Sequence, residues 1–144
     1  MLGIEGSVPL LSKEQFPLQM TGFDVLYGLE ILSLGEEEAT ARVRVRDEIL
    51  QPAGLVHGGV FASIAESLTS TATWMAVNAD GRSAQGLSNQ TSFLRPILSG
   101  TIHASARRRH KGRTTWVWEV DITDDEGRVC ALVRMTVAVR EPAG

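Results

Sequence analysis

The strongest constraint on the fold is one long helical pattern, in residues 57–77, set among strand patterns. Val60, Ile64 and Leu68 recur at four-residue spacing, which places them on one face of a helix. The segment Asn78-Ala79-Asp80-Gly81 then carries the polar residues and glycine that end helices. We therefore predict a single helix of about five turns over this range.

Most of the remaining chain alternates apolar and polar residues, which predicts strands with one buried face. The alternating segments are 39–46, 87–95, 102–107, 116–123 and 129–139. Residues 23–34 are apolar and typical of a strand, with Gly28 as a turn. The four segments after the helix predict a meander of consecutive antiparallel hairpins. A sheet with one apolar face needs a cover, which only the helix can supply, so we predict an α+β fold with an antiparallel sheet around one central helix.

Length and composition narrow the class of protein. The 144 residues fit one domain, 1–144, in which 1–22 are irregular because Pro9, Pro17 and Gly22 interrupt them. A net charge of −3 argues against a nucleic-acid surface. Cys130 is the single cysteine, which excludes an internal disulfide and a thiolate metal site. We expect neither a membrane span nor a secretory signal, and therefore a cytoplasmic protein.

The sequence contains four motifs that are informative together. They are Gln51-Pro52-x-Gly54-Leu55-Val56-His57-Gly58-Gly59 followed by Ala65-Glu66 and Ser70, Ser88-Asn89-x-Thr91-Ser92-Phe93-x-Arg95-Pro96, Thr114-Thr115-Trp116-x-Trp118, and Asp124-Asp125-x-Gly127-Arg128-x-Cys130-Ala131. In combination they resemble the hotdog-fold acyl-CoA thioesterases. The resemblance covers residues 23–140 and is to the 4-hydroxybenzoyl-CoA thioesterase branch, which uses Glu where another branch carries Asp. It implies a hotdog fold, a sheet wrapped around one helix, in agreement with the pattern of elements.

Glu66 is the first candidate catalytic residue. An ionisable side chain among Ile64, Ala65 and Leu68 is costly unless it is hydrogen-bonded or exposed, and a solvated helix edge is the simpler interpretation. Ser70 follows one turn later, and a carboxylate with a neighbouring hydroxyl can hold a water. The resemblance implies that Glu66 is the nucleophile or the general base and that Ser70 orients the water or the carboxylate.

The helix start supplies the second group of candidates. Free N–H groups of Gly58 and Gly59 at a helix N-terminus favour negative charge, such as that on a thioester oxygen under attack, although a simple tight turn has the same sequence. We assign the main polarising role to the Gly58 N–H. His57 is either a capping residue or a group that places the thioester, and Gln51 is either a loop amide or, by resemblance, a contact to the thioester from across a subunit interface.

Coenzyme A carries phosphates that need cations, and this acidic chain contains a basic cluster, made up of Arg95, Arg107, Arg108, Arg109, Lys111 and Arg113. A solvated strand face explains that cluster equally well. The candidates for substrate binding are Gly59, Ser88, Asn89, Arg95, Arg113, Thr114 and Thr115, although Arg113 stands where the family uses a small hydroxyl residue. The two remaining histidines show no metal-binding pattern. Trp116 and Trp118 share the apolar face of their segment, so we assign them to the core.

Together with the resemblance, these observations predict an acyl-CoA thioesterase that releases a free acid and coenzyme A. We expect no metal or redox cofactor, and coenzyme A itself counts as part of the substrate. An aromatic acyl group is favoured by the resemblance alone. A lone hotdog subunit leaves sheet edges open, so we expect a homodimer with the site between subunits, and dimers paired into a homotetramer. The alternatives are an acyl-thioester hydratase or dehydratase built on a His–acid pair, and a non-enzymatic acyl-CoA-binding module.

Overall fold

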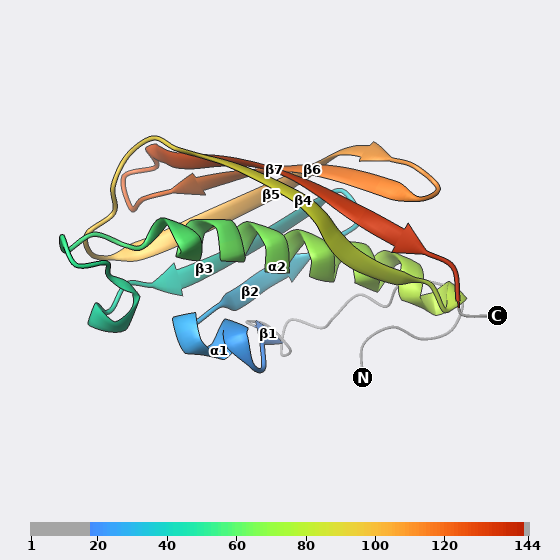
Figure 1. Ribbon diagram of the computed structural model, residues 1–144, viewed down its shortest axis with the longest axis horizontal. Helices are drawn as coiled ribbons and strands as arrows, with labels where there is room; N and C mark the ends of the chain where they lie inside the picture. Colours follow the sequence, from blue (N-terminus) through green and yellow to red (C-terminus); the bar gives the residue numbers. More distant parts are fainter. Residues whose placement is uncertain (1–17, 143–144) are drawn as a thin grey trace.

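The computed structural model of the protein describes residues 18–142. Seven strands form one antiparallel sheet in the order β1-β2-β3-β5-β6-β7-β4, and the sheet curves over one long helix, α2 (Figure 1). The predicted α+β architecture is therefore confirmed. The elements are β1 (Leu18–Gln19), α1 (Phe23–Tyr27), β2 (Glu30–Leu34), β3 (Glu38–Arg44), the 3-10 turn η2 (Asp47–Ile49), α2 (Gly58–Val77), the 3-10 turn η3 (Asn78–Asp80), β4 (Ser83–Phe93), β5 (Thr101–Lys111), β6 (Thr115–Thr123) and β7 (Val129–Arg140).

The core lies between α2 and the concave face of the sheet. Ile64 and Leu68 of α2 are fully buried, as the four-residue spacing predicts. Trp116 and Trp118 of β6 are buried in the same core, which confirms their assignment to packing. The indole N–H of Trp118 donates to the Thr73 hydroxyl at 3.0 Å, so its polar atom is satisfied inside the core.

The prediction of a strand through residues 23–34 is wrong in its first half. Residues 23–27 form the short helix α1, between Gly22 at φ 63° and Gly28 at φ 83°, and β2 begins only at Glu30. A positive φ suits glycine and breaks the extended conformation on both sides of the segment. The i to i+3 hydrogen bond from the Tyr27 hydroxyl to Asp24, at 2.6 Å, then stabilises the helical turn.

The predicted four-strand meander is wrong at its first connection. β5, β6 and β7 do form consecutive hairpins, but β4 pairs with β7 and β5 pairs with β3. β4 therefore lies at the end of the sheet order, with one side open and α2 beneath it. This position matters for the site, because α2 and β4 carry its central residues.

The N-terminal prediction is tested only at its end. Residues 1–17 lie outside the described part of the chain, whereas Leu18–Gln19 form the short strand β1 instead of irregular structure. The boundaries of a single domain over 1–144 stay a prediction. Within residues 18–142, we find no helix with the length and apolar character needed to cross a membrane.

Candidate active site

The loop before α2 is a tightly closed turn that aims the helix start. Gln51 N–H donates to Leu55 O at 2.7 Å, and Gly54, at φ +89°, donates back to Gln51 O at 2.9 Å. The Oε1 atom of Gln51 also accepts from the N–H of Ala53, within the same loop. The Nε2 hydrogens of Gln51 make no hydrogen bond within the described residues and are the donors of this side chain that could reach a substrate carbonyl.

His57 is the N-cap of α2. Its Nδ1 atom accepts from the N–H of Gly59 at 2.8 Å, so the neutral ring carries its proton on Nε2. The same bond occupies the Gly59 N–H, while the N–H of Val60 donates to His57 O at 2.9 Å. His57 thus acts as the cap of α2, and the Nε2–H of the neutral ring is its remaining donor.

Gly58 holds the first amide of α2. Among the described residues we find no acceptor for its N–H, which leaves this donor for a ligand. The ring of Phe93, from the end of β4, lies against the same residue, and a Cβ at position 58 would stand 2.8 Å from Phe93 Cε1. Glycine therefore allows both the packing of β4 on the helix start and a close approach to the amide.

Glu66 lies two turns further along α2, on the side that faces β4. Its side chain is exposed, and its Oε2 atom is 3.2 Å from the position that a Cβ of Gly86 would occupy. β4 also bulges here, because its register with β7 shifts between Gly86 and Ser88. Glycine and a bulge together make room for a carboxylate at the open edge of the sheet, and both features recur next to functional sites.

The structure tests which groups surround this carboxylate. Ser70 Oγ is buried and has no hydrogen-bond partner among the described residues, so it does not bond to Glu66 in a single chain. Asn89 Nδ2 donates to Ala62 O at 3.0 Å, and Thr91 Oγ1 donates to Asn89 Oδ1 at 2.7 Å. Asn89 therefore fastens β4 to α2 between the helix start and Glu66, whereas Ser88 is exposed on β4.

Comparison with known proteins identifies the family. The model of the thioesterase superfamily matches residues 53–131, which include the helix start, Glu66 and most of the sheet. The chain belongs to the thioesterase superfamily. A Mycobacterium tuberculosis relative named as an esterase is 42% identical over 118 residues, which are 80% of this chain and 84% of the relative.

Two further relatives agree with this membership. The 1,4-dihydroxy-2-naphthoyl-CoA hydrolase of Listeria monocytogenes is 31% identical over 120 residues, 83% of this chain and 97% of that protein. The crystal structure of a thioesterase from Haemophilus influenzae superposes with a TM-score of 0.85 at 29% identity and covers 96% of each chain. The protein is therefore a thioester hydrolase with the hotdog fold, as the sequence motifs predict.

The structure separates the two predicted phosphate-binding regions of this superfamily member. Arg95 N–H donates to Cys130 O at the start of β7, whereas Thr114 O accepts from Val139 N–H near the end of β7. Nine residues of β-strand span about 30 Å. Arg95 therefore lies far from Arg113, Thr114 and Thr115 within one chain, at the opposite end of β7.

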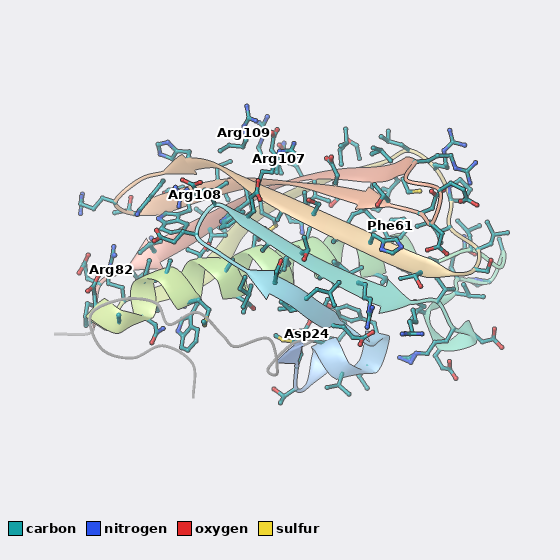
Figure 2. The ribbon with its side chains drawn as sticks, turned by 180° about the vertical axis from the view of Figure 1, so that it is seen from behind. Asp24, Phe61, Arg82, Arg107, Arg108 and Arg109 are labelled. Atoms are coloured by element: carbon teal, nitrogen blue, oxygen red, sulfur yellow. The ribbon has the colours of Figure 1, made fainter. Side chains whose placement is uncertain are left out.

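Most of the basic cluster is paired with carboxylates. On β5, Arg107 lies 3.6 Å from Asp121 and Arg109 lies 3.3 Å from Glu119, and both arginines project away from α2 (Figure 2). Lys111 bonds to Glu36 at 2.9 Å. These partners favour the solvated-face interpretation of the cluster over a phosphate site.

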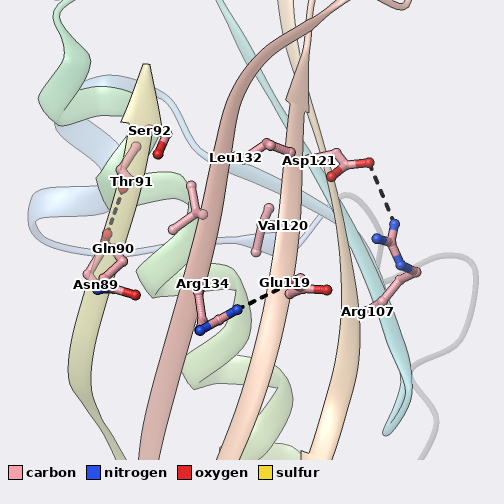
Figure 3. A pocket seen from close by; sticks show the side chains of 11 residues that line it. Asn89, Gln90, Thr91, Ser92, Arg107, Glu119, Val120, Asp121, Leu132 and Arg134 are labelled. Carbon is pink, nitrogen blue, oxygen red and sulfur yellow. Dashed lines mark hydrogen bonds and ion pairs between the residues drawn. The ribbon is translucent and has the colours of Figure 1, made fainter. Parts of the chain in front are cut away.

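The outer face of the sheet carries a hollow of about 700 Å³. Figure 3 shows the Arg107–Asp121 and Arg134–Glu119 ion pairs at its walls, on β5, β6 and β7. Residues 89–92 of β4 also line this hollow, whereas Glu66 and Gly58 do not, so it is not the site that these two residues form. The catalytic candidates of the thioesterase lie on α2, beside β4.

Sequence reasoning missed the contribution of α1. Phe23, Leu26 and Tyr27 line a cavity that also touches His57 and Gly59 at the start of α2. The available signal was Gly22 and Gly28 on either side of an apolar i, i+3, i+4 set, which is typical of one helical turn. This signal is short, and the neighbouring strand pattern conceals it.

Proposed function

We propose that the protein hydrolyses acyl-CoA thioesters, with Glu66 driving the attack and the Gly58 N–H polarising the thioester carbonyl. The observation that carries this proposal is the placement of both groups on α2, beside β4. Glu66 lies against Gly86 and Gly58 lies against Phe93, so both groups lie beside β4, seven residues apart along that strand. Eight helical residues separate them by about 12 Å, which is too far for both to act on one carbonyl from one chain.

A second copy of the chain removes this difficulty. β4 is eleven residues long, carries no charged side chain and presents Leu87 with 61% of its surface exposed. Such an edge is normally protected by charge or covered by a partner. Antiparallel pairing of two β4 strands about a two-fold axis near Asn89 and Gln90 would set Gly86 of one copy opposite Phe93 of the other. Glu66 of one subunit would then face Gly58 of the second.

The chemistry needs only groups that this arrangement supplies. The Gly58 N–H donates to the carbonyl oxygen as negative charge develops there, and loss of one such donor typically costs about 10²–10³ in rate. Glu66 either attacks the carbonyl carbon, forming a mixed anhydride and expelling the thiolate, or takes a proton from the water that attacks. Ser70 orients the water or the carboxylate, and Gln51 and the His57 Nε2–H hold the thioester.

The proposed substrate is an aromatic acyl-CoA. The Listeria monocytogenes relative is named for a hydroxylated naphthoyl-CoA, and the sequence motifs resemble the 4-hydroxybenzoyl-CoA branch. The two-fold axis also brings Arg95 of one copy to the end of the dimer that holds Arg113, Thr114 and Thr115 of the other, where the phosphates would bind. The comparisons name thioesterases and esterases, which favours hydrolysis over the hydratase alternative.

A substrate panel tests this proposal. Benzoyl-CoA, hydroxybenzoyl-CoA, naphthoyl-CoA and aliphatic acyl-CoAs are incubated with the protein, and free thiol is measured. We expect the aromatic thioesters to give the highest kcat/KM. Release of thiol from none of them would refute acyl-CoA hydrolysis, and a preference for aliphatic chains would refute the aromatic assignment.

A single turnover in ¹⁸O-labelled water tests whether Glu66 is the nucleophile. Attack of water on the Glu66 carbonyl of a mixed anhydride places label in the Glu66 carboxylate, which mass spectrometry of the peptide detects. General-base attack of water on the thioester places label only in the released acid, as does attack on the acyl carbonyl of an anhydride, so label in Glu66 is the result that identifies the nucleophile.

A further inference from the structure

A cavity of about 380 Å³ lies between α1, the η2 turn and the first turns of α2. Its walls are mostly apolar, from Phe23, Leu26, Ile49, Leu50 and Val60. This volume falls within the range of small-molecule sites. The cavity is separate from the polar hollow on the outer face of the sheet, and it opens on the side of the chain that carries the helix start.

The cavity ends at the candidate oxyanion donor. His57 and Gly59, the residues on either side of Gly58, both line it, so an acyl chain that leaves a carbonyl at the Gly58 N–H can enter it directly. Ser63 also lines it, but its hydroxyl is turned back to Gly59 O at 2.7 Å. Glu48 also lines the cavity, but its side chain is 72% exposed to solvent, and the rest of the lining suits an apolar group better than a strongly polar one.

A buried polar network fixes α1 over this cavity. Asp24 Oδ1 accepts from the Tyr27 hydroxyl at 2.6 Å and from Ser67 Oγ of α2 at 2.7 Å (Asp24 is labelled in Figure 2). Burial, and next the hydrogen bond to Asp24, raise the pKa of the Tyr27 hydroxyl, so Tyr27 remains a neutral donor. The Phe23 ring packs edge-on against Tyr27, with ring centroids 5.3 Å apart. α1 is thus a fixed wall.

α1 also exposes apolar side chains to solvent. Leu26 is 69% exposed and Phe23 is 64% exposed, although both line the cavity. Val25 is 55% exposed on the same short helix but does not line it. Clustered apolar side chains around a hollow favour an apolar ligand, because binding removes their surface from water.

We infer that this cavity binds the acyl group of the thioester and that Leu26, with Phe23, sets the largest acyl group the enzyme accepts. The inference rests on the proposed function at the Gly58 amide and adds the specificity-determining residues to it. The ligand class is a flat or compact apolar acyl group. Because α1 is short and anchored through Asp24, its exposed side chains can change without disturbing the core beneath.

Paired variants on α1 test the inference. Leu26→Ala should raise the ratio of kcat/KM for 2-naphthoyl-CoA to kcat/KM for benzoyl-CoA, and Leu26→Trp should lower it, each by at least about tenfold, as expected for a few carbon atoms in a hydrophobic pocket. Val25→Ala and Val25→Trp are the matched controls and should leave the ratio unchanged. An equal effect on both substrates, or an equal shift of the ratio in the Val25 variants, overturns the inference.

A second readout does not depend on turnover. In the wild-type protein with labelled methyl groups, 2-naphthoate should shift the NMR signals of Leu26 and Val60, and Leu26→Trp should abolish the shift of the Val60 signal. Unchanged Leu26 and Val60 signals at saturating 2-naphthoate overturn the acyl site even if the enzyme hydrolyses acyl-CoA. Shifted signals in a protein that hydrolyses no acyl-CoA refute the proposed function and leave the apolar site standing.

Discussion

Glu66 is an unusual surface carboxylate because the structure leaves a space beside it. Gly86 presents no side chain toward it, and the bulge of β4 lies at the same point. We predict that Glu66→Gln lowers kcat for the best aromatic acyl-CoA by about 10²–10⁴-fold, the range of general acid–base catalysis, with KM changed far less. Steady-state thiol release measures both constants.

The thermal stability of the variant is the control for this prediction. Glu66 is exposed and has no hydrogen bond to another described side chain, so Glu66→Gln should leave Tm unchanged. Glu37 is another exposed glutamate, with one ion pair of 3.8 Å to Arg108, so Glu37→Gln should leave kcat unchanged and change Tm little. Turnover of Glu66→Gln near that of Glu37→Gln would show that the carboxylate does not act in the reaction.

Ser70 poses a different question, because its buried hydroxyl has no partner within the described residues. An unsatisfied buried hydroxyl costs free energy, so removing it should not lower stability. We predict that Ser70→Ala keeps or raises Tm yet lowers kcat more than it raises KM, because we propose that the hydroxyl orients the water or the carboxylate of Glu66. A raised KM with unchanged kcat would instead indicate a contact to the bound substrate.

Elements defined by local signals could be predicted from the sequence, whereas their neighbours in space could not. α2 runs over Gly58–Val77, almost the predicted range, because its start, its apolar stripe and its stop are all encoded within the helix. The position of β4 beside β7 depends on contacts some 45 residues apart along the chain, which alternation cannot encode. The distance between Arg95 and Arg113 and the cavity beside α1 also depend on contacts between distant parts of the chain, so they could not be predicted from the sequence.

The β6–β7 hairpin is the element whose stability should depend most clearly on pH. Burial of Asp124 tends to raise its pKa, but hydrogen bonds from Arg128 N–H at 2.9 Å, Arg128 Nε at 2.8 Å and Glu126 N–H at 3.0 Å outweigh burial and lower the pKa of the carboxyl. A carboxyl with a lowered folded-state pKa stabilises the fold above its unfolded pKa, and this contribution is lost as pH falls through the folded value.

We therefore predict that Tm falls on acidification below about pH 4, the ordinary range for an aspartate, and that Asp124→Asn reduces this part of the pH dependence. At pH 7, Asp124→Asn should lower Tm because the amide cannot replace every accepted bond. Thermal unfolding from pH 2.5 to pH 7, followed by circular dichroism, measures both effects. A wild-type and variant pair with parallel Tm profiles would contradict this role.

At the scale of the whole molecule, the proposed site is incomplete in one chain. The separation of Gly58 and Glu66 by about 12 Å and the uncharged edge of β4 both support the proposed two-fold pair of subunits with two shared sites. Leu87→Lys should place a charge on that edge, and we expect it to yield monomers by light scattering with loss of hydrolysis. The pairing of such dimers into a tetramer stays a prediction.

Mixing two inactive variants decides whether the site is shared. Glu66→Gln removes the acid. Gly58→Ala hinders the approach of a substrate to the amide, and its Cβ would also collide with the Phe93 ring. A mixed dimer with shared sites has two sites. One site carries both substitutions, and the other combines an intact Glu66 with an intact Gly58. Random mixing makes half of the dimers mixed, each with one working site, so activity should return to about a quarter of the wild-type value. If each chain held a complete site, co-expressed and differently tagged subunits purified as mixed dimers would stay as inactive as either parent.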